Sequence, residues 1–200
     1  MSDLRFFVEK KKGFDLDAKR LEKQLREELG IDIKDLRLIN CYDIFNLSAD
    51  KENVKKMILS EPVTDSITEE LDLKGKKYFA VEFLPGQFDQ RADSAVQCIQ
   101  LLDATENPAI VSATTYVLRG EFSPEEIESI KSFCINPVDS RETGMEKPQT
   151  LIAHYDVPKG VIIFEHFRDM TEMELKSLYQ SLNLAMTFKD FEFIRDYFRD

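Results

Sequence analysis

The chain has 200 residues and a formal net charge of −11, with 27 Lys and Arg against 38 Asp and Glu. A surface this acidic repels phosphate backbones and anionic lipids, so the composition argues against nucleic-acid binding and against docking on a membrane. The 42% hydrophobic content is ample for a packed core. The sequence has no run of about eighteen apolar residues and no apolar segment after Met1, so we expect a cytoplasmic protein without a membrane span.

The three cysteines, Cys41, Cys98 and Cys134, are widely separated and lie in apolar-rich segments. This pattern favours buried, reduced thiols over disulfides or a zinc site. The two histidines, His154 and His166, have no partner at metal-ligand spacing. A catalytic Cys-His pair is the weaker alternative. The sequence thus indicates no metal site and no bound cofactor in these residues.

The first part of the chain has the pattern of alternating strands and helices. Apolar and aromatic content predicts a strand over 4–9, and helical spacing predicts a helix over 15–29. A second strand is predicted over 36–47. We expect Ser48 to cap the next helix, which ends before Pro62 because the residue ahead of a proline disfavours helical backbone.

The most irregular stretch is 84–98, LPGQFDQRADSAVQC, between a predicted strand over 78–83 and a predicted helix. Its Pro-Gly pair is expected to form a turn with positive φ, and Asp89 to cap the helix. One interpretation is structural, with a salt-linked trio of Asp89, Arg91 and Asp93, and the other is contact with an anionic ligand. The structural or interface motif consists of Pro85, Gly86, Gln87, Asp89, Arg91 and Asp93.

The order strand, helix, strand, helix occurs twice. Residues 34–63 align with 109–138 without a gap, which places Leu36 on Val111. The alternative is that any two segments with this order would align as well. The match favours an internal duplication, in which two half-units form a pseudo-dimer within one chain.

The predicted fold class is α+β, with duplicated βαβα half-units over 1–74 and 75–145 forming one domain over 1–145. A polar segment over 136–149, with two Pro and one Gly, marks the boundary. Residues 146–200 are expected to form a small, mostly helical region.

The last predicted helix, capped by Thr187, carries aromatic residues at helical spacing. Such a stripe usually forms a core. A small helical pair has little else to cover it, so we expect part of the stripe to pack against polypeptide outside this sequence. The candidate docking face consists of Phe188, Phe191, Tyr197 and Phe198.

The chain resembles the N-terminal part of the long-form phosphoribosylformylglycinamidine synthases, glutamine-dependent amidotransferases of purine biosynthesis. The segments that carry the resemblance are VEKKKGFDLDAKRL, LRLINCYDIF, ILSEPVTD, LPGQFDQRADSAVQC, SATTYVLRG, CINPVDSRE and SLNLAMTFKDF. They extend over essentially the whole chain. Residues 4–71 are similar to the small S-type subunit of the three-component form, which the long form carries fused and doubled.

The resemblance implies an S-type domain over 1–145 and the start of a linker domain over 146–200. It also implies a docking and scaffold role in an ATP-driven ligase, where the chain helps to line the ammonia route. Its partners would be the synthetase and glutaminase domains of the same polypeptide, beyond Asp200, where ATP and magnesium would bind. No catalytic residue is therefore assigned here, and the chain alone is expected to be inactive. Self-association stays open, and the alternative function is a free-standing duplicated α/β module that binds a small metabolite.

Overall fold

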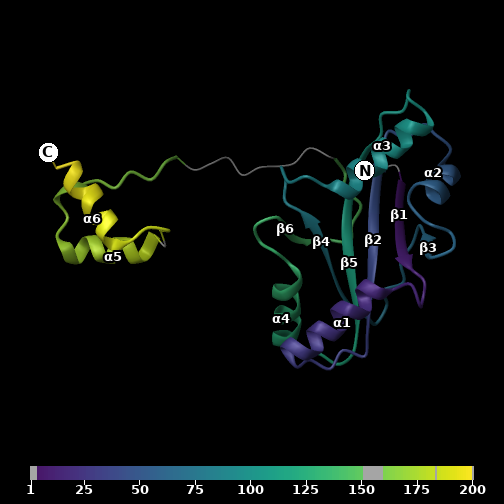
Figure 1. The fold of residues 1–200 in the computed structure, drawn as a ribbon, viewed down its shortest axis with the longest axis horizontal. Helices are drawn as coiled ribbons and strands as arrows, with labels where there is room; N and C mark the ends of the chain where they lie inside the picture. Colours follow the sequence, from purple (N-terminus) through teal and green to yellow (C-terminus); the bar gives the residue numbers. More distant parts are fainter. Residues whose placement is uncertain (1–3, 151–159, 183, 200) are drawn as a thin grey trace. The chain divides into compact units, whose positions relative to one another are not determined.

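The computed structural model describes residues 4–150, 160–182 and 184–199. The chain divides into two compact units, Met1–Tyr155 and Asp156–Asp200 (Figure 1). Within its described part, the larger unit is α+β, with a six-stranded antiparallel sheet and four helices. The described part of the smaller unit contains two α-helices and a short 3-10 turn.

The larger unit follows the predicted alternation and adds two short strands that the sequence does not predict, β3 and β6. Its elements are β1 (Leu4–Lys10), α1 (Leu16–Leu29), β2 (Asp35–Phe45), α2 (Lys51–Met57), β3 (Asp65–Thr68), β4 (Lys77–Phe83), α3 (Gln90–Leu102), β5 (Ala109–Arg119), α4 (Pro124–Cys134) and β6 (Ser140–Thr143). The strand order is β3-β1-β2-β5-β4-β6. The central strands β2 and β5 pair over their whole length, from Asp35 opposite Arg119 to Phe45 opposite Ala109.

All four helices of the larger unit pack on one face of the sheet, in two separate clusters. Leu25 of α1 and Ile130 of α4 are buried in one cluster, which contacts β2 at Leu36. Val54 of α2 and Ile99 of α3 are buried in the other, which contacts β2 near its far end. Because the two clusters lie at opposite ends of the central strands, the middle of this face is left for polar residues.

The opposite face of the sheet is crossed by the segment that follows β6. Arg5 on β1 donates from Nε to Asp43 Oδ1 at 2.9 Å and from Nη2 to Oδ2 at 2.6 Å, and the two side chains are 8% and 7% exposed. The same guanidinium donates to the carbonyl oxygens of Met145 at 2.5 Å and Glu146 at 3.0 Å. Arg5 therefore ties the chain beyond β6 to the sheet with charge-assisted hydrogen bonds.

The expected cap of α2 is wrong. The N-cap is Asp50, whose Oδ1 accepts the N–H of Glu52 at 3.1 Å. The backbone N–H of Ser48 donates instead to the Glu106 side chain at 3.1 Å. Because Asp50 is the cap, the helix starts later than predicted. It ends at Met57, before Pro62 is reached.

The ungapped alignment of 34–63 with 109–138 is wrong by one residue within the strands. Side chains alternate between the two faces of a sheet, so a shift of one residue exchanges the faces. The register pairs Leu36 with Leu118 beneath the helices, whereas Val111 lies on the opposite face. The bounds of β2 and β5 do correspond end to end, so the strands match only after this shift.

The smaller unit is built from α5 (Glu172–Leu182), α6 (Phe188–Tyr197) and a 3-10 turn, η1 (Phe167–Asp169). The predicted cap of α6 is confirmed, because Thr187 and Asp190 form a reciprocal capping box. Leu175 and Phe191 are its buried apolar side chains among the described residues. No helix in the described ranges is long and apolar enough to cross a membrane.

The buried Arg5–Asp43 pair can be tested with Arg5→Met, Asp43→Leu and the double variant. Each single change removes the charged group that faces a buried charge and is expected to lower the free energy of unfolding by about 3–5 kcal/mol, whereas the double change recovers part of that loss. Urea denaturation measures these values. Arg37→Met is the control, because the Arg37–Glu9 pair is more exposed and is expected to contribute about 1 kcal/mol or less. Equal losses for Arg5→Met and Arg37→Met would contradict the structural role of Arg5.

Candidate functional site

The turn that the sequence predicts between β4 and α3 is present. Gly86 has φ +93°, and the N–H of Gln87 donates to the carbonyl oxygen of Leu84 at 2.9 Å. This is the positive φ that a Pro-Gly turn requires at its second central position. Pro85 and Gly86 therefore reverse the chain from the sheet into α3.

Asp89 connects α3 to the central strand β5. Its Oδ1 accepts the N–H of Ala92 at 2.9 Å, which confirms the predicted cap. The same carboxylate accepts the Ser112 hydroxyl at 2.9 Å and the Ser112 N–H at 2.8 Å. With three donors around it, Asp89 holds the start of α3 in a fixed position over the sheet.

The salt-linked trio of Asp89, Arg91 and Asp93 does not form. Asp93 accepts the Gln97 side-chain amide at 2.6 Å, and Asp89 is occupied by backbone and hydroxyl donors. Arg91 is exposed and makes no hydrogen bond or ion pair with the described part of the chain. The motif thus contains one well-coordinated carboxylate, that of Asp89, and one guanidinium, that of Arg91, without a partner in the described ranges.

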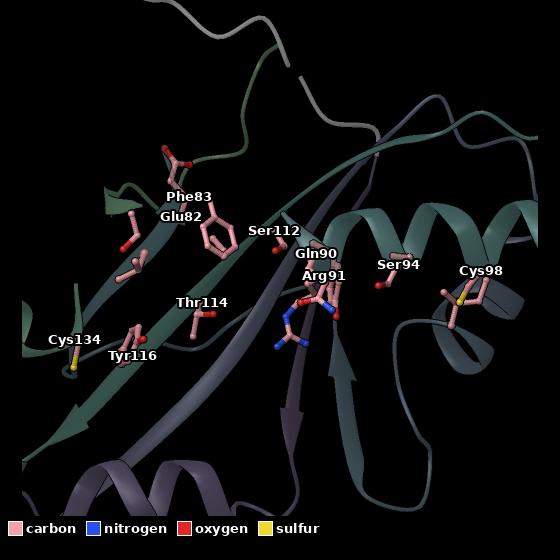
Figure 2. Close-up of a pocket in the computed structure, with 16 residues that line it drawn as sticks. Glu82, Phe83, Gln90, Arg91, Ser94, Cys98, Ser112, Thr114, Tyr116 and Cys134 are labelled. Atoms are coloured by element: carbon pink, nitrogen blue, oxygen red, sulfur yellow. The ribbon is translucent and has the colours of Figure 1, made fainter. Parts of the chain in front are cut away.

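A cavity of about 600 Å³ lies beside this motif, on the helix-covered face of the sheet (Figure 2). Its lining includes Arg91 and Ser94 from α3, Thr114 and Tyr116 from β5, and Phe83 from β4. Of the charged, amide and hydroxyl side chains in this lining, sequence analysis singled out Arg91 alone. Helical and strand periodicity place these residues on α3 and β5, but the packing of the two elements is needed to bring them together.

Tyr116 forms a fixed aromatic wall of the cavity. Its ring stacks on Phe79 with a centroid distance of 4.7 Å and an interplanar angle of 3°. Burial raises the pKa of Tyr116 to about 12, because the phenolate would be poorly solvated there. The hydroxyl therefore remains a neutral hydrogen-bond donor near neutral pH.

The cysteines do not assemble a nucleophilic site. Burial raises the pKa of the Cys41 thiol to about 12 and that of Cys134 to about 11, so both stay protonated. All three are free thiols. The expected burial is confirmed for Cys41 and is wrong for Cys98, which is exposed. His166 is an exposed residue with φ 62°.

The described residues also contain no group of three or more His, Cys, Asp or Glu side chains able to hold a metal ion. His154, the other candidate named from the sequence, lies outside the described ranges.

The candidate docking face on α6 divides into buried and exposed residues. Phe191 is only 5% exposed and packs edge-on against Phe167 at 5.2 Å, so it is core and its assignment to a docking face is wrong. Phe188 is half-buried against Tyr179, with ring centroids 5.5 Å apart. These two side chains therefore pack inside the smaller unit and are not available to contact a partner.

Three other aromatic side chains, two on α6 and one on its C-cap residue, face solvent. Phe193, Tyr197 and Phe198 are 70%, 68% and 58% exposed. Their rings are adjacent in space, with centroid distances of 6.3 Å from Phe193 to Tyr197 and 5.3 Å from Tyr197 to Phe198. Sequence analysis named Tyr197 and Phe198 but missed Phe193, although its i, i+4 spacing from Tyr197 was a usable signal.

Comparison with known proteins assigns no family to this chain. No family model matches it, and no curated protein matches it either.

The strain at the β4–α3 turn can be tested with Gly86→Ala. A Cβ at Gly86 would meet no atom within 4 Å, so the expected loss of about 1–3 kcal/mol in unfolding free energy comes from the positive φ alone. Gly144→Ala is the matched control, because Gly144 lacks a positive φ and its nearest atom would be 4.0 Å away. Thermal unfolding should show a lower melting temperature for the first variant only. Equal melting temperatures for the two variants would contradict the turn geometry.

Proposed function

We propose that the chain is the N-terminal docking and scaffold part of a glutamine-dependent, ATP-driven amidotransferase of the long-form phosphoribosylformylglycinamidine synthase type. The observation that carries the proposal is the strand order β3-β1-β2-β5-β4-β6. From the central pair outward, the first half contributes its second, first and third strands, and the second half does the same. This is the arrangement that two fused copies of a small S-type subunit would give.

Two pairs of loops support the duplication. The Glu61 carbonyl accepts the N–H groups of Thr64 at 3.0 Å and Asp65 at 2.7 Å. The Asn136 carbonyl accepts those of Asp139 at 3.1 Å and Ser140 at 2.8 Å, and in both loops Pro-Val follows the accepting residue. Likewise, the glycine turns after β1 and β4 have φ +95° and +93°. We infer that a single half-unit was copied and that the pair acts as a dimer within one chain.

The exposed aromatic surface of the smaller unit, formed by Phe193, Tyr197 and Phe198, supports a docking role. Burying apolar surface contributes about 25 cal/mol per Å², and contiguous exposed patches of this kind mark interaction sites. Arg199 lies just beyond the C-terminal end of the same helix and is exposed, and Arg is among the residues enriched at interfaces. In this proposal the surface contacts the synthetase part of a longer polypeptide.

The proposed role is to organise other catalytic parts. Ammonia is small and is lost or protonated in bulk water, so a rigid module that keeps water from the route between glutaminase and synthetase has a physical purpose. In the proposal ATP and magnesium belong to the synthetase domain, and this chain supplies no catalytic group to the reaction.

A second candidate function is a free-standing module that binds a small metabolite. The cavity beside α3 favours it, because it combines an aromatic wall with a few convergent polar groups. The docking proposal ranks first because the cavity explains neither the strand order nor the exposed aromatic surface.

The docking proposal is tested in the complete polypeptide that contains this chain. The measured quantity is formation of formylglycinamidine ribonucleotide from formylglycinamide ribonucleotide, ATP and glutamine. We expect the complete polypeptide to be active and residues 1–200 alone to be inactive. Phe193→Asp/Tyr197→Asp should lower the glutamine-dependent rate at least about tenfold, the scale of losing an interface anchor.

The matched control is Ser181→Asp, which adds negative charge to the exposed surface of α5 and is expected to leave the rate unchanged. The melting temperature of the double variant should also stay unchanged, because both aromatic side chains are exposed. Product formation by residues 1–200 alone, or a complete polypeptide without this activity, would overturn the proposal.

A further inference from the structure

We propose that the cavity beside α3 binds a small organic anion, in which one carboxylate or phosphate group is joined to a flat, apolar body. Arg91 would hold the acid group, and the aromatic side chains of Phe83 and Tyr116 would contact the body. The site lies wholly in the larger unit. The inference therefore does not depend on the docking surface of the smaller unit.

Arg91 is the one Lys or Arg that lines this cavity, and it has no hydrogen-bond or ion-pair partner among the described residues. By contrast, Arg5 is bound to Asp43, Arg37 donates to Glu9 at 2.6 Å and 2.5 Å, and Arg141 donates to Glu82 at 2.8 Å. Figure 2 shows the Arg91 side chain extending away from α3 on the side where β5 runs. A guanidinium presents five donors in a planar fork that matches a carboxylate or phosphate.

The N-terminal end of helix α3 is not assigned as the anion site. The Asp89 carboxylate already accepts the Ala92 N–H and places a negative charge at the helix N-terminus. An anion bound there would be repelled by Asp89. The acid group is therefore assigned to the tip of Arg91, with the hydroxyls of Ser94 and Thr114 lining the same cavity.

A second cavity that Arg91 also lines has more cations than anions around it, although the whole chain carries −11. It shares Tyr42, Arg91, Thr114 and Tyr116 with the first one. It is also lined by Lys12, Lys34 and Arg119, which make no ion pair with a described residue. Its carboxylates are engaged in ion pairs or with a backbone N–H, as seen for Glu9, Asp15, Asp17, Asp35 and Asp65. Cations without partners in a hollow attract anions and raise their local concentration.

The remaining lining suits a flat apolar body. Phe83 is partly exposed at the cavity rim, and its ring projects into the space beside β5 in Figure 2. Tyr116 is fixed by stacking on Phe79, so its face needs little ordering on binding. Offset stacking on such rings stabilises the complex beyond the contribution of the area buried.

The cavity on the opposite face makes a useful contrast. It is lined by Arg5 and Arg141, but both guanidinium groups already form ion pairs, Arg5 with Asp43 and Arg141 with Glu82. A ligand that used either guanidinium would have to break an existing ion pair, which leaves only the exposed Lys147 among the described cations of this lining. The geometry thus points to the cavity beside α3 as the anion site.

The test is calorimetric titration of the 200-residue chain with four probes: phenyl phosphate, benzoate, inorganic phosphate and benzyl alcohol. Phenyl phosphate or benzoate should bind saturably with a dissociation constant of about 1 mM or lower. The comparison between them separates a phosphate from a carboxylate site. Inorganic phosphate and benzyl alcohol should bind at least about tenfold more weakly, because each lacks one half of the interaction.

Arg91→Gln should weaken binding of the aromatic acid by about 10–100-fold, the scale of a charge-assisted bidentate contact. Arg168→Gln removes the same charge from the smaller unit and should leave the binding constant unchanged. Both variants should keep the wild-type melting temperature, since neither arginine side chain has a protein partner in the described ranges.

Absence of saturation up to about 10 mM for both aromatic acids would overturn the proposal. Equal binding by wild type and Arg91→Gln would overturn it as well. Equal binding of inorganic phosphate and phenyl phosphate would refute the assignment of Phe83 and Tyr116.

Discussion

The antiparallel pairing of β2 with β5 is the interaction on which the rest of the larger unit depends. Without it, each half would be a three-stranded sheet with one long exposed edge, and such edges promote aggregation. With it, the backbone N–H and C=O groups of the two edge strands pair with each other along their full length, and six strands form one continuous sheet. The pairing also brings the helices of both halves onto one face, with α1 and α4 at one end of the central strands and α2 and α3 at the other. The cavity beside α3 exists because this helix pairing leaves the middle of the face uncovered.

The sequence predicted the long elements well, because apolar periodicity and β-branched content are strong in them. It missed β3 and β6, whose sequences DSIT and SRET are short and polar, as edge strands commonly are. It placed the cap of α2 on Ser48 when Asp50, two positions later, was equally suitable. That choice depends on Glu106, which lies far away in the sequence and binds the Ser48 N–H.

The candidate site was only partly predictable for the same reason. Asp89 as a cap follows from local sequence, but its bonds to Ser112 require the packing of α3 on β5. Those bonds occupy Asp89 and leave Arg91 without the ion pair that spacing suggested. On α6, periodicity correctly found an aromatic helix. It could not tell which faces the rest of the small unit would cover, so Phe191 was assigned outward and Phe193 was overlooked.

The larger unit thus has a continuous sheet with a cavity on one face, and the smaller unit is a helical pair with three exposed aromatic side chains. The central physical claim is that the two halves of the sheet open as a single cooperative unit. Native-state hydrogen exchange of the whole chain tests it by measuring the opening free energy at each backbone amide. We predict that the central amides of β2 and β5 share the highest opening free energy in the chain and lose protection together. Separate opening free energies for β1-β2-β3 and β4-β5-β6 would contradict the account.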